Sequence, residues 1–297
     1  MKDVLARPII FFGVPRSGTT IIAETILSNN TLAWPSNYSD RFPKLVGLNL
    51  LRRFFQNKYF HIHGNKSQLH KVGILNKYAF KADESYPMWD YLVGEEFSKG
   101  MIDREATEAE KISIRHYFSS LVVKQGKERL AFKITGPSRI KFLQSVFPDA
   151  CFIRVKRKSI PTISSLMNVG FWKKGGAKAI WWNGLIRQGD ESKIKSFTET
   201  DLQLTAYQVH RLNILTEREL QTINVNLLEL EYEHFLNNSN SEIQKICSFC
   251  DLEFSKEIMD FLVENPLVNR NKEDHQYYNE SQLKLIEQAR MITASEF

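Results

Sequence analysis

The chain has 297 residues, of which 42% are hydrophobic and 25% are charged, and its 40 Lys and Arg residues outnumber its 34 Asp and Glu residues by six. These values are ordinary for a globular protein and exclude a chain that is disordered, collagen-like or coiled-coil throughout. The charges are mixed along the sequence, which favours an anionic ligand over a nucleic acid.

The N-terminal sequence indicates neither a membrane span nor a signal peptide. The longest apolar stretches, such as residues 9–14, are far shorter than the roughly 18 residues that a spanning helix needs. Asp3 and Arg7 interrupt the apolar start, and Arg16 ends the run. We therefore expect a cytoplasmic protein without a membrane span.

The cysteines favour a reducing compartment, because three is an odd number for a disulfide framework. Cys247 and Cys250 form a CxxC pair. One such pair without a second makes a poor zinc site. We expect two small apolar residues on one helix face, and no metal site.

The first predicted elements are a strand, a turn and a helix. Residues 8–14 are a short apolar run with a proline at its edge, which is typical of a buried strand. Residues 15–18 predict a turn, and residues 19–28 have apolar side chains at helical spacing. Asn29-Asn30 can end this helix.

The middle of the chain alternates strands and helices. Residues 31–80 have no clear periodicity, whereas residues 105–124 predict a helix. The elements that follow are a strand at 129–134, a helix over 140–147 capped by Ser138, a strand at 151–155 and a helix at 160–168. This order is the signature of a parallel sheet with right-handed crossovers.

The C-terminal third is predicted to be mainly helical. Residues 169–190 are rich in Gly and Trp and suggest a functional loop or short helices. The remaining predicted elements are helices at 201–220, 242–249, 256–263 and 280–291, a strand at 225–230 and a polar turn at 237–241. No linker divides the chain, so we expect one α/β domain over residues 1–297, with three layers around a central parallel sheet.

The first loop is a candidate anion site. Residues 13–20 read GVPRSGTT, with glycines five positions apart and hydroxyls that open a helix. Such a loop turns backbone N–H groups inward, and the helix N-terminus adds its positive dipole end. The ATP-binding version has Lys where this chain has Thr19, and its cation here is Arg16. This favours a short anionic group held without metal, with a P-loop kinase as the alternative.

Two motifs resemble those of the PAPS-dependent sulfotransferases. Residues 11–20, FFGVPRSGTT, resemble the loop that binds the 5′-phosphosulfate, in the Arg form common in the bacterial and carbohydrate-type branches. Residues 151–157, CFIRVKR, with Ser165 eight positions after Arg157, are similar to the 3′-phosphate motif. The Asp-Pro that usually follows this Arg is Lys158-Ser159 here, and Arg154 is close enough in sequence to share the contact.

Two further segments extend the resemblance along the chain. Residues 230–233, LEYE, look like the family's YE-L segment. Residues 269–272, NRNK, lie where the family often has a basic loop that closes over the nucleotide.

The resemblance implies a P-loop nucleotide-binding fold and transfer of a sulfuryl group from PAPS to an acceptor, with release of adenosine 3′,5′-bisphosphate (PAP) and no metal. It implies that residues 31–128 and 169–222 are insertions that shape the acceptor pocket. The donor-binding residues that it implies are Pro15, Arg16, Ser17, Gly18, Thr19, Thr20, Arg157, Ser165, Arg270 and Lys272.

The resemblance also suggests the catalytic residues. The cytosolic branch has its catalytic His in a K-T-H-x-P segment, which matches residues 133–137 here, so Lys133 is kept and Thr135 replaces the His. Thr135 cannot act as a base. Glu84, in the segment DESYPMW, is our candidate base, with Arg16 and Lys133 stabilising charge. The other candidates for the base are His61, His63 and His70.

The acceptor is predicted only as a class, a small molecule or a carbohydrate with a hydroxyl or amine. Its aromatic walls are expected from Trp89, Trp172, Trp181, Trp182 and the Phe-rich residues 42–60. An acidic neighbourhood of Asp83, Glu84, Asp90, Glu95 and Glu96 would favour a cationic acceptor if it faced the pocket.

We expect the chain to be a monomer or a homodimer. The alternatives to a sulfotransferase are a kinase and a non-catalytic nucleotide-binding protein, the latter favoured only by the missing His.

Overall fold

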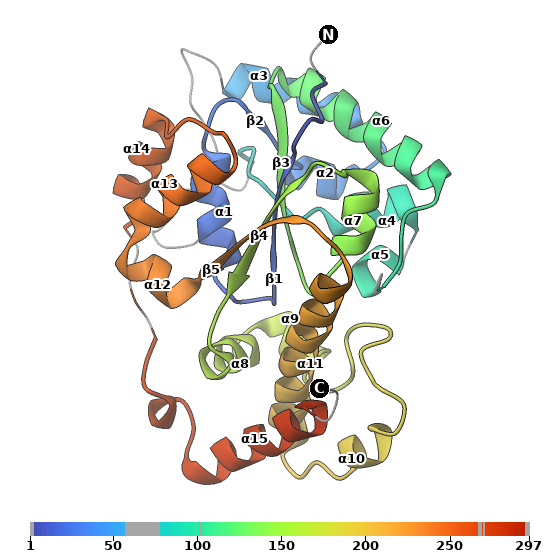
Figure 1. Ribbon diagram of the computed structural model, residues 1–297, viewed down its shortest axis with the longest axis vertical. Helices are drawn as coiled ribbons and strands as arrows, with labels where there is room; N and C mark the ends of the chain where they lie inside the picture. Colours follow the sequence, from blue (N-terminus) through green and yellow to red (C-terminus); the bar gives the residue numbers. More distant parts are fainter. Residues whose placement is uncertain are drawn as a thin grey trace.

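The fold is built on a parallel sheet (Figure 1). The computed structural model describes residues 3–56, 78–94, 96–100, 103–266, 269 and 271–294. Within these residues the sheet has five strands in the order β2-β3-β1-β4-β5. The strands are β1 (Ile9–Gly13), β2 (Leu32–Ala33), β3 (Arg129–Thr135), β4 (Cys151–Lys156) and β5 (Asn226–Glu231). The predicted α/β fold with a central parallel sheet is confirmed.

Both faces of the sheet are buried, which explains the uninterrupted apolar run of β1. Ile9 and Phe11 face one hydrophobic core, and Ile10 and Phe12 face another on the opposite side. Consecutive residues of a strand point to opposite faces, so a strand covered on both sides must be apolar at every position.

Helices cover the two faces. One face packs against α1 (Thr19–Leu27), α12 (Tyr232–Asn237), α13 (Ser239–Phe249) and α14 (Lys256–Glu264). The other face packs against α4 (Tyr86–Val93), α6 (Glu108–Gln125) and α7 (Ile140–Val146), with α2 (Asn37–Arg41), η1 (Val46–Leu51), α3 (Arg52–Phe55) and α5 (Glu96–Lys99) against them.

A further group of helices lies beyond the ends of the strands. It comprises α8 (Ser159–Met167), α9 (Gly170–Lys174), α10 (Glu191–Lys195), α11 (Thr200–Thr222), η3 (Asp274–Gln276) and α15 (Glu280–Ala294). These helices have their own core, in which Trp172, Tyr207 and Ala289 are buried. The C-terminal ends of β1, β3 and β4 therefore face this group rather than open solvent (Figure 1).

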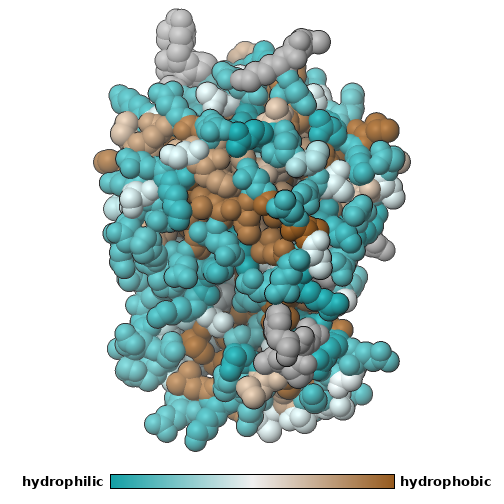
Figure 2. All heavy atoms as spheres, in the orientation of Figure 1, coloured by the Kyte–Doolittle hydropathy of each residue, from teal (hydrophilic) through white to brown (hydrophobic). Residues whose placement is uncertain are grey.

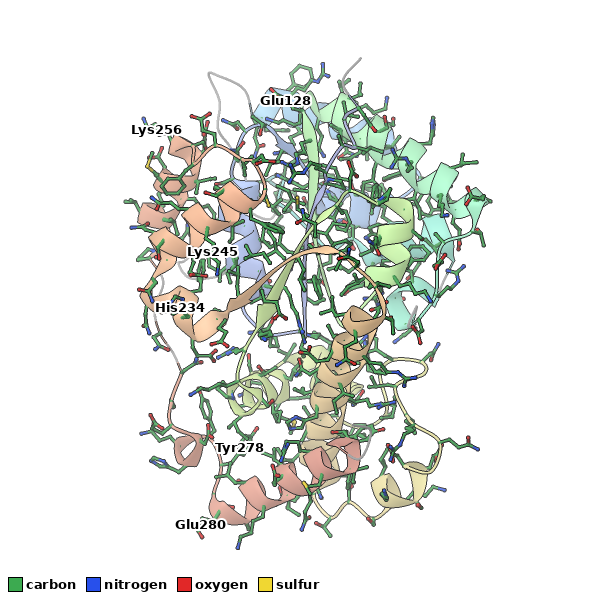
Figure 3. The ribbon with its side chains drawn as sticks, in the orientation of Figure 1. Glu128, His234, Lys245, Lys256, Tyr278 and Glu280 are labelled. Atoms are coloured by element: carbon green, nitrogen blue, oxygen red, sulfur yellow. The ribbon has the colours of Figure 1, made fainter. Side chains whose placement is uncertain are left out.

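The polar side chains lie on the outer sides of the helices. Figure 3 labels Lys245 on α13 and Lys256 on α14, both exposed, while Ile243 and Ile246 of α13 are buried against the sheet. Figure 2 shows the same view as a mostly hydrophilic surface with apolar atoms gathered near its middle. No helix in the described part of the chain is both long and apolar enough to cross a membrane.

Helix α6 shows how local sequence sets an element's ends. The Thr107 side chain accepts from the backbone N–H of Glu110, and the Glu110 carboxylate accepts from that of Thr107 at 2.7 Å, which is a capping box. Gly126, with φ of 66°, ends the helix in the left-handed conformation. The predicted start at residue 105 was three residues early, because the cap lies at Thr107.

Two local predictions were wrong, and one region left without an assignment is structured. Residues 31–56 form β2 and short helices that their periodicity did not reveal. The polar segment 237–241 is not a turn between elements, since α12 ends at Asn237 and α13 begins at Ser239. Ser138 does not cap α7, which begins at Ile140 after Arg139 without a side-chain cap. Short polar helices depend on tertiary packing, which periodicity does not measure.

We predict that truncating Ile114 destabilises the protein far more than truncating Ile112 on the same helix. Ile114 is fully buried and Ile112 is 70% exposed. Ile114→Ala should lower the free energy of unfolding by about 2–5 kcal/mol, and Ile112→Ala should change it by about 0.5 kcal/mol or less. Denaturant unfolding measures both. Equal losses in the free energy of unfolding would contradict the assignment of Ile114 to the buried face of α6 and of Ile112 to its exposed face.

Candidate active site

A cavity of about 1010 Å³ lies at the C-terminal edge of the sheet. One half is lined by the loop after β1, the end of β4 and the start of α12, with Pro15, Arg16, Gly18, Thr19, Thr20, Arg157 and Tyr232. The other half is lined by Asp83, Glu84, Tyr86, Asp90, Lys99, Phe171, Trp172, Trp181 and Trp182, with Lys133 and Thr135 of β3 beside them. Open α/β sheets bind ligands at this edge.

The loop between β1 and α1 forms the first half as an N–H cradle. Arg16 and Gly18 have left-handed backbones, with φ of 71° and 90°. Among the described residues, the backbone N–H groups of Gly18, Thr19 and Thr20 have no acceptor in the protein. Successive N–H groups of this kind, at a helix N-terminus, bind anions.

Gly18 is required by two independent constraints. Its φ of 90° is one that side chains rarely allow, and an added Cβ would lie 2.1 Å from the ring of Tyr232. Tyr232 therefore packs directly on the cradle. The segment LEYE had been noted in the sequence, but Tyr232 was not among the predicted site residues.

Arg157 and Ser165, which the sequence predicts to share one phosphate site, both contact Arg16 in the loop between β1 and α1. The Arg16 Nε donates to Ser165 Oγ at 2.9 Å, and Arg157 Nη1 donates to the backbone carbonyl of Arg16 at 2.9 Å. The Arg157 guanidinium lies 4.9 Å from the centre of the Tyr232 ring. Its Nε is buried with no hydrogen-bond partner in the described part of the chain.

The electrostatics of Arg157 fit an anion site. Burial lowers the pKa of Arg157, and Tyr232 and Glu233 partly offset this effect. An arginine is charged in either case, so a half-buried guanidinium whose buried Nε–H is unused gains by contacting an anion.

The C-terminal basic segment, residues 269–272, contacts Arg157 through Asn271, which was not among the predicted site residues. Asn271 accepts from Arg157 Nη2 through its Oδ1 and donates to Glu233 at 3.2 Å. Lys272 donates its backbone N–H to the Tyr277 hydroxyl at 2.9 Å, and its side chain is not part of the cavity lining. Arg270 lies outside the described residues.

Arg154 does not take part in this site. It is buried, and its Nη1 donates to Glu217 at 2.7 Å and to Glu229 at 2.9 Å. Both carboxylates hold it away from the cavity. The strand-end arginine that reaches the loop is therefore Arg157.

Four side chains form one hydrogen-bonded cluster that joins the second half to the cradle. Lys133 Nζ donates to Glu84 Oε1 at 2.6 Å and to Thr20 Oγ1 at 3.0 Å. Thr135 Oγ1 donates to Glu84 Oε2 at 2.9 Å. The side chains of Lys133 and Glu84 are 7% and 14% exposed, so the ion pair is largely shielded from water.

The backbone around Glu84 and Thr135 is held by buried polar groups. The Tyr86 hydroxyl donates to the Thr135 carbonyl and accepts from the Thr135 N–H at 3.3 Å. Burial, with Glu84 nearby, raises the pKa of Tyr86 far above its ordinary value, so it stays a neutral hydroxyl. Arg139 donates to the carbonyls of Phe97 at 2.9 Å and Pro137 at 3.0 Å.

Aromatic side chains form the wall of this half. Trp172 is fixed by a hydrogen bond from its Nε1 to Thr205 Oγ1 at 2.9 Å. Trp181 and Trp182 stand beside it, and Lys99 Nζ lies 3.8 Å from the centre of the Trp181 ring. Phe171 is 54% exposed at the rim.

Some predicted wall residues lie elsewhere. Trp89 is fully buried and stacks on Phe97 in the sheet core, so its expected role in the wall was wrong. Phe42, Phe54 and Phe55 are exposed outside this cavity. The acidic residues Asp83 and Asp90 do line it.

Other candidates lie outside the described residues: Phe60, His61, His63, His70, Glu95 and the side chain of Glu96. In the part of the chain that the structure does describe, no group of three or more His, Cys, Asp or Glu side chains is arranged to hold a metal ion.

Comparisons with known proteins find a matching family model and solved structures of the same fold. The family model described as the sulfotransferase family matches residues 8–256. The crystal structure of sulfotransferase STF9 from Mycobacterium avium superposes with a TM-score of 0.59 at 17% identity, covering 98% of this chain and 76% of that one. Sulfotransferase STF1 from Mycobacterium tuberculosis H37Rv gives 0.54 at 12% identity, covering 99% and 78%. No protein of curated function matches by sequence.

We predict that Gly18→Ala destabilises the cradle. The left-handed backbone alone costs about 1–2 kcal/mol with a side chain, and the contact with the Tyr232 ring adds to that loss. A lower melting temperature is expected, whereas Gly47→Ala, with nothing within 4 Å of the new Cβ, should melt near the wild type. Identical melting of the two variants would contradict the packing of Tyr232 on the loop.

Proposed function

Because this chain belongs to the sulfotransferase family, whose model covers residues 8–256, we propose that it transfers a sulfuryl group from PAPS to a hydroxyl or amine of a small-molecule or carbohydrate acceptor and releases PAP. The observation that carries the proposal is one cavity that is lined both by the N–H cradle and by the Glu84–Lys133 pair, and Lys133 joins the two through its hydrogen bond to Thr20. Sulfuryl transfer needs an anion site and a proton acceptor within reach of each other.

The residues of the first half fit an adenosine bisphosphate donor. The cradle offers the backbone N–H groups of Gly18, Thr19 and Thr20, which have no acceptor among the described residues, for the 5′ group. Arg157, with its unpartnered buried Nε, and Ser165 fit the 3′-phosphate that the family motif implies. PAPS, when bound, supplies the activated sulfuryl group.

Arg16 belongs to both parts of this donor site. Its backbone lies in the loop, and its side chain reaches Ser165 on α8. A guanidinium and fixed N–H groups are already in place where the leaving phosphate gains charge, and such preorganised donors lower the barrier without reorganisation. We assign charge stabilisation to Arg16 and to Lys133.

Glu84 is the proposed general base. Its Oε1 accepts from Lys133 and its Oε2 accepts from Thr135, so the carboxylate is held in a fixed orientation at the cavity. Thr135, at the position of the family's His, holds the carboxylate rather than replacing the His. Lys133 balances the charge of Glu84 and touches Thr20 at the start of α1.

The aromatic wall suits an acceptor with a flat or ring-shaped face. Phe171 and Trp181 can stack either a sugar ring or an aromatic ring. The hydroxyl or amine of such an acceptor would then point toward Glu84.

Thermal stabilisation tests the donor. At about 100 times its dissociation constant, a ligand stabilises the folded state by roughly 2.7 kcal/mol. We expect PAP to raise the melting temperature and ATP with Mg²⁺ at matched excess to leave it unchanged. A rise with ATP and Mg²⁺ alone would contradict the proposal and favour a kinase, and no rise with PAP would contradict it outright.

The same assay with Arg157→Ala tests the assignment of the 3′-phosphate. We predict that this variant loses most of the PAP shift, because a desolvated arginine–phosphate contact is lost. Arg218→Ala, an exposed arginine of α11 outside the cavity, is the matched control and should keep the full shift. An undiminished shift in Arg157→Ala would place the phosphate elsewhere.

Glu84→Gln tests the base. A general base contributes about 10²–10⁴-fold, so we predict a loss of that size in kcat, with the PAP shift kept because Glu84 lies outside the cradle. Asp83→Asn removes the neighbouring carboxylate at the same cavity and should lose far less. The measurement is PAP formation from PAPS with an accepted substrate. A kcat near the wild type for Glu84→Gln would exclude it as the base.

A further inference from the structure

Cys151 and Cys250 meet at the edge of the sheet opposite the cavity. Cys151 is the first residue of β4, and Cys250 follows the last turn of α13. Both are fully buried in the same core, and one guanidinium contacts both residues: Arg129 Nη2 lies against the Cys151 sulfur, and Arg129 Nη1 donates to the Cys250 carbonyl. The sequence suggested the CxxC pair of Cys247 and Cys250, but the fold pairs Cys250 with a residue about 100 positions away.

Three N–H donors point at the sulfur of Cys151. Arg7 Nη2 and Arg129 Nη2 each lie at 3.6 Å, and Asn226 Nδ2 lies at 3.3 Å. Two of these donors carry full positive charge. A sulfur with this surrounding is stabilised as a thiolate, which is the nucleophilic form of cysteine.

The titration of the pair follows from this geometry. The neighbouring Cys250 thiol, together with Arg7 and Arg129, lowers the pKa of Cys151 below its ordinary value. The same contact and burial raise the pKa of Cys250 above its ordinary value. Both shifts favour a Cys151 thiolate beside a Cys250 thiol.

Two exposed side chains cover the pair. Arg7 and Asp251 form an ion pair, and their side chains are 44% and 68% exposed. Both residues have left-handed backbones with φ of 48°. Surface ion pairs of this kind stabilise weakly, so little free energy opposes their separation and the entry of a small molecule such as hydrogen peroxide.

Cys247 provides an internal contrast on the same helix. It is buried among apolar residues, and burial raises its pKa to about 11. In the described part of the chain, no hydrogen bond reaches its sulfur. Burial without a cation makes a cysteine inert.

We propose that Cys151 and Cys250 form a redox-active dithiol that hydrogen peroxide converts to a disulfide. The Cys151 thiolate attacks one peroxide oxygen, the O–O bond breaks, and the hydroxide that leaves takes up a proton to become water. The Cys250 thiol then displaces hydroxide from the Cys151 sulfenic acid, forms the S–S bond and supplies the proton for a second water. Two thiols are oxidised and one peroxide is reduced.

The disulfide would tie the start of β4 to the end of α13. It closes a loop of roughly 100 residues, which restricts the unfolded chain and raises stability. The proposal does not depend on the proposed function, because its readouts are thiol chemistry and melting temperature.

The test is thiol titration of the full chain after brief exposure to hydrogen peroxide, with peptide mapping. The titratable thiols of the unfolded protein should fall from three to one, the remaining one being Cys247, and dithiothreitol should restore all three. The oxidised protein should melt at a higher temperature than the reduced one. Three intact thiols, or oxidation of Cys247 in preference to Cys151, would overturn the proposal.

Two variants sharpen the result. Cys247→Ala should still form the disulfide, which leaves no free thiol. Cys250→Ser should stop at the sulfenic acid of Cys151, which dimedone traps, and should show no oxidative gain in melting temperature. Disulfide formation between Cys247 and Cys151 in the wild type, or no dimedone adduct in Cys250→Ser, would contradict the assigned roles.

Discussion

The candidate site depends on the two contacts that the ammonium group of Lys133 makes, with Glu84 and with Thr20. This ammonium group lies near the end of β3, almost fully buried, and a buried charge must be paired and hydrogen-bonded to be tolerated. Its partners are Glu84 from the segment before α4 and Thr20 from the first turn of α1. One charge therefore fixes the distance between the anion cradle and the proposed base, although the three residues are far apart in sequence.

The remaining features follow from where parallel strands end. The loop after β1, the Lys133–Thr135 segment of β3 and Arg157 after β4 all lie at the same edge, because neighbouring strands run in the same direction. Helices α8, α9 and α11 close this edge, and Trp172 and Trp182 of that region form the aromatic wall. The opposite edge carries the Cys151–Cys250 pair.

The sequence predicted what local signals encode. The strand–loop–helix around Gly18 was readable because a buried strand, a turn and helical spacing follow each other. Arg157 and Ser165 were predicted because they match a motif in which the two residues are eight positions apart. Tyr232 and Asn271 were missed as site residues because only tertiary packing brings them to the loop. The Cys151–Cys250 pair was missed for the same reason, since it joins residues that are close only in the fold.

The most direct test of the account is a double-mutant cycle of Lys133→Met and Glu84→Gln, measured as PAP formation from PAPS with an accepted substrate. If the ion pair acts as one unit, the double variant should be no more than about tenfold slower than the slower single variant. If the two losses multiply in full, Lys133 and Glu84 act independently, and the central place given to their contact is wrong.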